Sequence, residues 1–442
     1  MKLIKSTALM ASAITISASM AFAEITILAW PGGEPEESLR QIVKSYNETA
    51  GAEIGSTAEL LYFSRDNFFD KMLADSAAGS KEFDIMLTAT YNVGKYAPFM
   101  EPINDLIDDD LMSVFPQSAI DSQSFEGNFY GIPTDLGVHF LYYRTDLMDE
   151  LMSNADWQAK YAAISMEYMG TAMQPKAPDD WTWDDYMASA LFFTKSINSD
   201  SPVRYGTVLQ LKNLLFNVMI WQGIAASYGG DWMDSDGNIT VDSAGYRRAL
   251  ELYKKLVELE ATPADSLSYE YAEANGAFGT GRVAFYTQWS AAYASLVNAD
   301  EFPAIAGKFD ITHQPAGSVG IKTHFHALGL GINAASENKD EARAFLRYLG
   351  TENAMKMYIK GGGQPPVVGR IVSEVAADRP DMVMMSSHAG DYGKVMAGGT
   401  SSSALDIYTN QAENFTGYWG GQLDIDTAIA NVEEFMANEF AN

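Results

Sequence analysis

The chain has 442 residues, no cysteine, and 58 acidic against 29 basic residues, which gives a formal net charge of −29 at pH 7. A protein this acidic repels nucleic acid and anionic lipid surfaces, so we expect neither as a partner. The absence of cysteine excludes disulfides, thiolate metal sites, cysteine nucleophiles and the lipidated cysteine of a bacterial lipoprotein.

Residues 1–23 have the pattern of a secretory signal. Lys2 and Lys5 precede an apolar run, and small residues follow it, which predicts cleavage before Glu24. Ser and Thr interrupt the run, which is shorter than the ~20 apolar residues of a membrane span. We therefore expect a mature protein that diffuses freely in a Gram-negative periplasm. Its length exceeds what one core usually serves, which favours two domains.

The N-terminal part alternates strands with helices. Residues 24–30, 58–63 and 83–88 are predicted strands, and the segments between them have helical spacing, the first helix ending at Gly51. Such units form right-handed crossovers in a parallel sheet, where ligands bind at the carboxyl ends of the strands. Aromatic or hydrogen-bonding side chains occupy those ends: Trp30, Phe63, Ser64, Arg65, Thr90 and Tyr91.

The middle of the chain is mostly helical after an apolar strand at 138–143. Thr182 and Asp185 have the spacing of a capping box at the start of one helix. A second, apolar helix carries Trp221, and a third, residues 244–259, follows the candidate caps Asp242 and Ser243. The Asp-Gly pair just before it has the spacing of a turn and not of a calcium loop.

Residues 283–286 form an apolar run that ends in Gln288, Trp289 and Ser290. A large indole between two polar residues at a strand end is unusual for a core position. It therefore raises the question of what Trp289 faces.

No segment has a phosphate loop, a dinucleotide fingerprint, a nucleophile elbow or the His-Glu-x-x-His motif. His324 and His326 would point the same way on a strand, but no third metal ligand is predicted nearby. The acidic residues offer many carboxylate pairs for glycoside hydrolysis, none within a distinctive motif. We expect no enzyme activity, no cofactor and no metal.

Aromatic residues recur at element boundaries beside amides, carboxylates and arginines. A sugar presents a face of C–H groups that packs against an aromatic ring, and its hydroxyls both donate and accept hydrogen bonds. The strand ends of this chain suit such a ligand.

Six motifs in order make the chain resemble the extracellular solute-binding proteins of ABC importers, in the family that includes maltose-binding protein. They begin at Tyr130, Trp181, Gly229, Phe278, Gly331 and Gly361, as "YGIPTDLGVHFLYYRTDL", "WTWDDY", "GGDWMDSDGNITVDS", "FGTGRVAFYTQW", "GINAASENKDEARAFLRYL" and "GGGQPP". The resemblance covers essentially the whole mature chain. The first loop departs from it, because "PGGEPEES" has no Asn-Gly-Asp-Lys stretch, which argues against maltose itself as the ligand.

The resemblance implies an α/β fold with two lobes and a ligand cleft between them. Lobe one would hold residues 24–134 and 288–327, and lobe two residues 135–287 and 328–442. Crossing segments would lie near 133–137, 284–287 and 327–331, so Trp289 would stand at the cleft. The resemblance nominates ten ligand-binding residues: Trp30, Ser64, Arg65, Tyr91, Asp135, Trp221, Trp289, His326, Gln364 and Arg370.

The implied function is capture of a carbohydrate, from mono- to oligosaccharide or glycoside, by hinge closure and its delivery to the permease subunits of an ABC importer. We expect a monomer. Two alternatives stay open, namely the same fold binding a polyol, an acidic sugar or another polar solute, and a secreted glycoside hydrolase. The sequence does not set the size, linkage or charge of the ligand.

Overall fold

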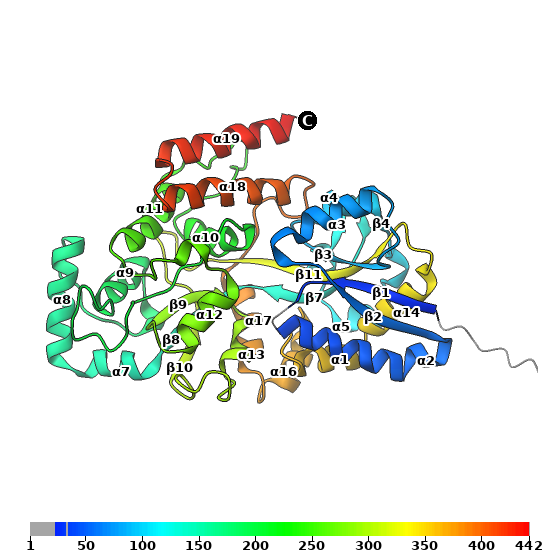
Figure 1. Cartoon of the computed structure of the whole chain (residues 1–442), viewed down its shortest axis with the longest axis horizontal. Coiled ribbons are helices and arrows are strands. Elements are labelled where there is room, and N and C mark those ends of the chain that lie inside the picture. The colour runs from blue at the N-terminus through cyan, green and yellow to red at the C-terminus, as the bar shows by residue number, and fades with distance from the viewer. Residues whose placement is uncertain (1–22, 32–33, 442) are drawn as a thin grey trace, which may run out of the picture.

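A computed structural model describes residues 23–31 and 34–441 of the chain. Nearly all of the predicted signal segment lies outside these residues, so its cleavage stays a prediction. Within the described residues, the model contains no helix with the length and apolar character of a membrane span. Helices and strands form two α/β lobes side by side, with strands running between them (Figure 1).

The first lobe is built on a seven-stranded sheet. Its first three strands are mutually parallel, as predicted, and β11 then pairs antiparallel with β3, β4 and β7. The main order is β12-β11-β3-β1-β2. The strands are β1 (Ala23–Ala29), β2 (Ser56–Tyr62), β3 (Ile85–Ala89), β4 (Met100–Glu101), β7 (Ile132–Gly137), β11 (Thr323–Asn333) and β12 (Gly393–Val395), and β5 (Ser124–Phe125) and β6 (Asn128–Phe129) form a separate hairpin.

Ten helices surround this sheet in the described part of the chain. The expected end of the first helix at Gly51 is wrong, because the helix breaks at Thr49 and resumes until Gly55, which takes the left-handed conformation (φ 71°) that ends a helix. The helices are α1 (Glu34–Glu48), α2 (Ala50–Ile54), α3 (Phe68–Ala77), α4 (Val93–Tyr96), α5 (Asp109–Val114), α6 (Gln117–Asp121), α14 (Lys339–Leu349), α15 (Glu352–Lys360), α16 (Gly369–Val375) and α17 (Pro380–Tyr392).

The second lobe packs helices around a three-stranded antiparallel sheet in the order β10-β8-β9. The C-terminal helices α18 and α19 pack on one another, and α18 also packs on α10 and α11 (Figure 1). The elements are β8 (His139–Arg144), β9 (Phe285–Trp289), β10 (Phe309–Thr312), α7 (Thr145–Ser153), α8 (Ala155–Met169), α9 (Trp183–Phe192), α10 (Leu215–Ser227), α11 (Ala244–Glu258), α12 (Tyr271–Gly279), α13 (Ala292–Leu296), α18 (Ala404–Trp419) and α19 (Ile425–Ala441).

The predicted helix starts in the second lobe are confirmed. The Thr182 hydroxyl accepts a bond from the Asp185 backbone N–H, and the Asp185 carboxylate accepts one from the Thr182 N–H at 2.9 Å, which completes the capping box. Of the two candidate caps before α11, the structure uses Ser243, whose hydroxyl accepts from the Tyr246 N–H.

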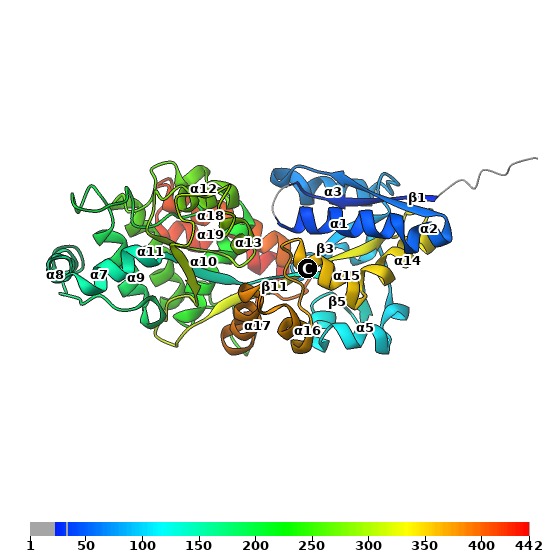
Figure 2. The same cartoon turned by 90° about the horizontal axis from the view of Figure 1, so that it is seen from below.

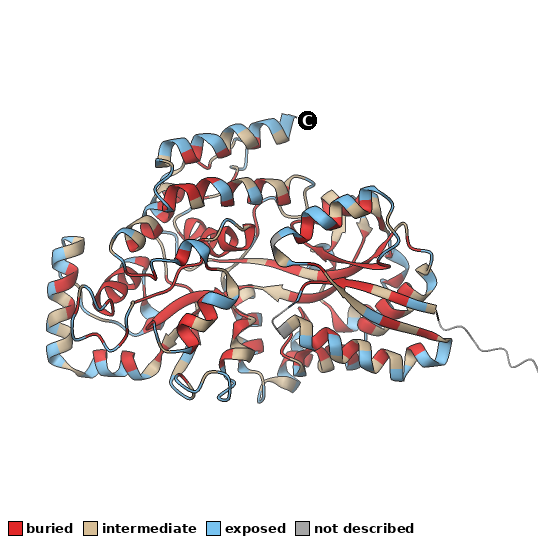
Figure 3. Cartoon of the chain, in the orientation of Figure 1, coloured by how far each residue is buried: buried red, intermediate tan, exposed pale blue. Residues whose placement is uncertain are grey.

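Strands connect the lobes at their centre (Figure 2). Residues 137–139 carry the chain from β7 in the large sheet to β8 in the small one. β9 ends at Trp289, and the chain continues into α13, which packs on α1 of the first lobe as well as on α12. These central strands are almost wholly buried (Figure 3), so the cleft between the lobes rests on a well-packed base.

The expected lobe boundary at residue 327 is wrong. Residues 328–332 of β11 pair with β3, and residues 332–333 pair with β4, so this stretch belongs to the sheet of the first lobe. β10, which was expected in the first lobe, pairs with β8 of the second. The lobe to which each of these strands belongs depends on pairing between segments far apart in the chain. The order of segments in the sequence does not reveal that pairing.

Candidate ligand-binding site

A cleft between the lobes holds about 180 Å³ of free volume. Both lobes contribute to its walls, and five aromatic side chains line it together with three charged ones. The lining residues include Trp30, Arg65, Tyr91, Asp135, Phe216, Glu270, Tyr271, Trp289, Ser290, His326, Leu328 and Gln364.

Trp289 faces this cleft from the end of β9. The residue is half-buried, and its indole packs against the His139 ring, with centroids 4.2 Å apart. The His326 ring meets the indole edge-on at 5.2 Å. The indole is therefore held in place from behind and open toward the cleft.

Arg65 lines the cleft from the first lobe, in a short 3-10 turn of residues 65–67 after β2. Its guanidinium carbon stands 4.9 Å from the ring centre of Trp30 and 5.0 Å from that of Phe216. Arg65 Nη2 also donates to Glu270 Oε1 at 2.7 Å. Because Glu270 is the N-cap of α12 in the second lobe, this ion pair joins the two lobes across the cleft.

Asp135 is fixed from behind by two donors. The Tyr358 hydroxyl donates to Oδ2 at 2.5 Å, and the Gln364 backbone N–H donates to Oδ1 at 3.0 Å. Tyr358 lies on α15, so the first lobe orients the carboxylate toward the cleft.

Gln364 is almost completely enclosed, although it touches the cleft wall. Its side-chain amide donates to Asp381 at 2.6 Å, and its side-chain oxygen accepts from the Ser290 hydroxyl at 2.5 Å. The Gln364 side chain thus positions Ser290, and its backbone N–H positions Asp135.

Seven of the ten nominated residues line the cleft: Trp30, Arg65, Tyr91, Asp135, Trp289, His326 and Gln364. Tyr91 is fully buried, and its hydroxyl has no partner among the described residues. Burial raises the pKa of this hydroxyl, so it is a neutral group. That these seven residues bind a ligand stays a prediction.

The structure places the other three nominated residues elsewhere. Ser64 is exposed just before the 3-10 turn and does not line the cleft. Arg370, at the start of α16, is an exposed residue that pairs with Glu352 at 2.6 Å. Ser64 and Arg370 are therefore both surface residues.

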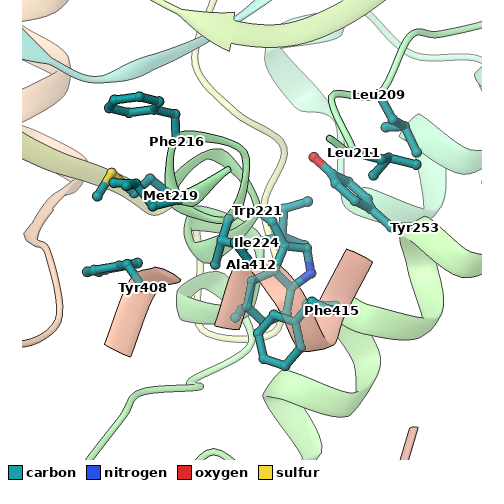
Figure 4. Close-up of a cluster of buried hydrophobic side chains, with 14 of the residues drawn as sticks. Leu209, Leu211, Phe216, Met219, Trp221, Ile224, Tyr253, Tyr408, Ala412 and Phe415 are labelled. Carbon is teal, nitrogen blue, oxygen red and sulfur yellow. The ribbon is translucent and has the colours of Figure 1, made fainter. Parts of the chain in front are cut away.

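Trp221 is the clearest correction, because it lies in the core of the second lobe (Figure 4). Its ring packs 4.9 Å from that of Phe415 on α18 and 5.1 Å from that of Tyr246 on α11. The expected position of Trp221 at the cleft is therefore wrong, and Phe216 of the same helix lines the cleft instead.

Phe216, Glu270 and Tyr271 are cleft residues that the sequence did not single out. Phe216 stands in the first turn of an apolar helix, where nothing in the pattern separates it from core residues. Glu270 carries one signal in the sequence, because Glu273 follows it at the spacing of a capping box, and the Glu270 N–H does bond to the Glu273 carboxylate.

All five histidines of the chain lie near the crossing strands. The His324 ring is 5.6 Å from that of His139 and 5.2 Å from that of His326, and the His313 and His388 rings stack at 6.4 Å. In the described part of the chain, no group of three or more His, Cys, Asp or Glu residues is arranged to hold a metal ion.

Acid is expected to destabilise the protein through these histidines. Burial lowers the pKa of His326 and of His388 to about 3, whereas a histidine in the unfolded chain has a pKa near 6.5. Below about pH 6.5 the unfolded chain binds protons that the folded protein excludes. Stability is therefore expected to be complete above pH 7 and to fall toward pH 3, by about 2 kcal/mol per histidine at pH 5.

Unfolding midpoints at pH 7.5 and pH 5 would test this expectation. The variant His388→Asn removes one titrating ring and should lose less stability between these two pH values. Since most carboxylates titrate below this window, equal losses in the variant and the parent protein would contradict the explanation.

Removing the Arg65–Glu270 pair is expected to favour the open cleft. Both side chains are mostly buried, with exposed fractions of 28% and 13%. Such a pair contributes about 1 kcal/mol, a roughly fivefold shift between open and closed forms. Small-angle scattering of ligand-free Glu270→Gln should therefore give a larger radius of gyration than the parent protein.

A matched control is Glu337→Gln, because Glu337 pairs with Lys81 on the surface and is 73% exposed. A second interlobe pair joins Lys95 on α4 to Asp406 on α18, so the double variant Glu270→Gln/Asp406→Asn should open further. Unchanged dimensions in the double variant would contradict a role for these pairs in closure.

Two lobes that enclose an aromatic cleft, joined by crossing strands, define a protein that captures a small ligand between two domains. The chain belongs to the bacterial extracellular solute-binding proteins, because the model of that family matches residues 32–356. This family comprises transport binding proteins.

Related sequences are only distantly similar to this chain. A probable ABC transporter-binding protein of Deinococcus radiodurans is 29% identical over 262 residues, which cover 57% of this chain and 54% of that protein. A lactose-binding protein of Rhizobium radiobacter is 24% identical over 354 residues, which cover 78% of this chain and 74% of that protein. The chain thus matches only about half the length of the first of these relatives.

Solved structures confirm the two-lobed fold. Maltose-bound MalE3 of T. maritima superposes with a TM-score of 0.78 at 21% identity, covering 94% of this chain and 99% of that one. A solute-binding protein of Agrobacterium vitis with bound D-mannitol gives a TM-score of 0.75 at 18% identity, covering 95% and 98%. At these identities the likeness concerns the fold alone.

Proposed function

We propose that this protein is the periplasmic binding component of an ABC importer for a small carbohydrate. The observation that carries the proposal is the cleft itself, in which aromatic rings from both lobes surround Arg65, Asp135 and Glu270. Rings pack against the C–H face of a sugar, while the charged groups form strong hydrogen bonds with its hydroxyls. The names of the relatives, among them a lactose-binding protein, support the same class of ligand.

The size of the cleft favours the small end of the carbohydrate range. Its free volume of about 180 Å³ is below the ~300 Å³ at which pockets for drug-sized ligands begin. A monosaccharide or an acyclic polyol suits this volume better than an oligosaccharide. A polyol is the second candidate, since D-mannitol occupies one structural neighbour.

Hinge closure is the proposed mechanism. A ligand that contacts Trp289 from one side and Arg65 from the other holds both lobes, and only such contacts shift the balance between open and closed forms. The closed protein would then dock on the permease subunits as a monomer. We further propose that residues 24–134 and 135–287 form the bulk of lobes one and two, that the signal segment is cleaved, and that the protein has no catalytic activity of its own.

A thermal-shift screen would test the proposal. The panel would contain lactose, maltose, D-mannitol, ribitol and sugar acids, each with the mature protein at pH 7.5. A ligand present at one hundred times its Kd adds about 2.7 kcal/mol, enough to move the midpoint by several degrees. A ligand that raises the midpoint and is recovered intact would support the proposal. No hit among the sugars and polyols would overturn it, and a hit that is consumed would point to a hydrolase.

A further inference from the structure

One line of buried hydrogen bonds leads from the cleft wall into the second lobe. His326 Nδ1 lies 3.0 Å from His324 Nε2, and His324 Nδ1 lies 3.1 Å from Gln222 Oε1. The Tyr408 hydroxyl of α18 donates to the same Gln222 oxygen. All four side chains are buried, with exposed fractions of 6% or less.

The donor-to-acceptor direction of these hydrogen bonds follows from Tyr408, at the far end of the line. Burial raises the pKa of the Tyr408 hydroxyl, so it keeps its proton, which it donates to Gln222 Oε1. Gln222 Oε1 is an acceptor only. His324 Nδ1 must therefore carry a hydrogen to make its bond to that oxygen.

Both imidazoles of this line are neutral and have a defined tautomer. Burial lowers the pKa of His324 and of His326, so each ring is neutral and carries one hydrogen. With its hydrogen on Nδ1, His324 offers a bare Nε2, which accepts the hydrogen on His326 Nδ1. The remaining nitrogen of His326, Nε2, is then without a hydrogen.

The His326 ring is clamped in this orientation. A Cβ placed on Gly137 would lie 2.7 Å from His326 Cε1, and the rings of Tyr91 and Trp289 meet the imidazole edge-on at 5.1 and 5.2 Å. His326 lines the cleft, and its one hydrogen bond to the described residues runs through Nδ1, so a ligand is the group that its Nε2 can serve.

We propose that His326 presents a hydrogen-bond acceptor to the cleft and thereby selects a ligand that donates a hydrogen bond at that point. A sugar or polyol hydroxyl meets this requirement. A carboxylate or phosphate oxygen does not, because it would set lone pair against lone pair. The inference rests on the proposed function and deepens it, since it favours a neutral polyhydroxy ligand over an acidic sugar at this position.

Long-range ¹H–¹⁵N NMR of ligand-free protein labelled with ¹⁵N-histidine reads the tautomer directly. The expected result at pH 7.5 is a protonated Nδ1 and a bare Nε2 for His326, assigned by comparison with His326→Asn. A protonated Nε2 would overturn the proposal. Because no ligand is present, this result does not depend on whether the protein binds sugars.

Two variants test whether Tyr408 and Gln222 set the direction of these hydrogen bonds. Tyr408→Phe removes the donor that orients Gln222, and the His326 signals should then show a mixture of tautomers. Gln222→Glu keeps an acceptor at the same place and should retain the bare Nε2. An unchanged tautomer in Tyr408→Phe would show that Tyr408 does not set the direction of these hydrogen bonds and would contradict the proposed line from Tyr408 to His326.

A binding measurement connects the tautomer to selection. With D-mannitol or lactose as the probe, His326→Leu should weaken binding about 10- to 100-fold, whereas His326→Gln, whose amide oxygen accepts, should lose less than tenfold. Equal losses in both variants would contradict a specific acceptor. If no sugar or polyol of the thermal-shift panel binds the parent protein, the proposed function fails while the NMR result still decides the tautomer.

Discussion

Replacing Trp289 by alanine is expected to weaken ligand binding about 30- to 1,000-fold. The indole presents a ring to the cleft and is held from behind by His139 at 4.2 Å. Truncating an aromatic anchor of this kind typically costs about 2–4 kcal/mol of binding free energy. Titration calorimetry with the ligand found by the thermal-shift screen would measure the loss.

The matched control for this variant is Trp157→Ala. Trp157 is also half-buried, but it packs against Phe192 in the second lobe and does not line the cleft. Its removal should leave the affinity unchanged, and Trp289→Phe should restore part of the loss because it keeps a ring. Equal affinities in the parent protein and Trp289→Ala would rule out stacking at this position.

Replacing Trp221 by alanine is expected to lower the free energy of unfolding by about 3–5 kcal/mol. The side chain is fully buried between α10, α11 and α18, so its loss removes contacts with Tyr246 and Phe415 and leaves a cavity. Urea unfolding would show an earlier midpoint. Ligand affinity, measured well below that midpoint, should stay within a few fold of the parent value.

The two tryptophan variants together separate the cleft from the core. Trp221→Phe keeps an aromatic ring and should lose clearly less stability than Trp221→Ala. A large loss of affinity at unchanged stability in Trp221→Ala would instead place this residue at the ligand and not in the core.

The first three strand ends show how far the sequence carries. Trp30, Arg65 and Tyr91 were predicted near one edge of a parallel sheet, and all three line the cleft. This prediction depends only on the crossover rule for parallel strands, which fixes where carboxyl ends lie. Ser64 fails by one position, because the chain turns at Arg65 and the neighbouring side chain points to solvent.

The sequence could not show whether Trp221 or Phe216 lines the cleft. Every residue of α10 is buried, so the helix has no polar face that would show which side meets the cleft. The two residues are five positions apart, which turns them about 140° around the helix axis. Packing on α11 and α18 fixes that rotation.

Local pattern and chain order were enough to predict the fold class, the family, the helix caps at Thr182 and Ser243 and the strand ends at the cleft. They could not predict the sheet to which β10 and β11 belong, the pairing of Arg65 with Glu270, or the line of hydrogen bonds from His326 to Tyr408. Each of these joins residues distant in the chain, and the free energy that orders them comes from burial and hydrogen bonding between elements whose relative placement no local pattern encodes.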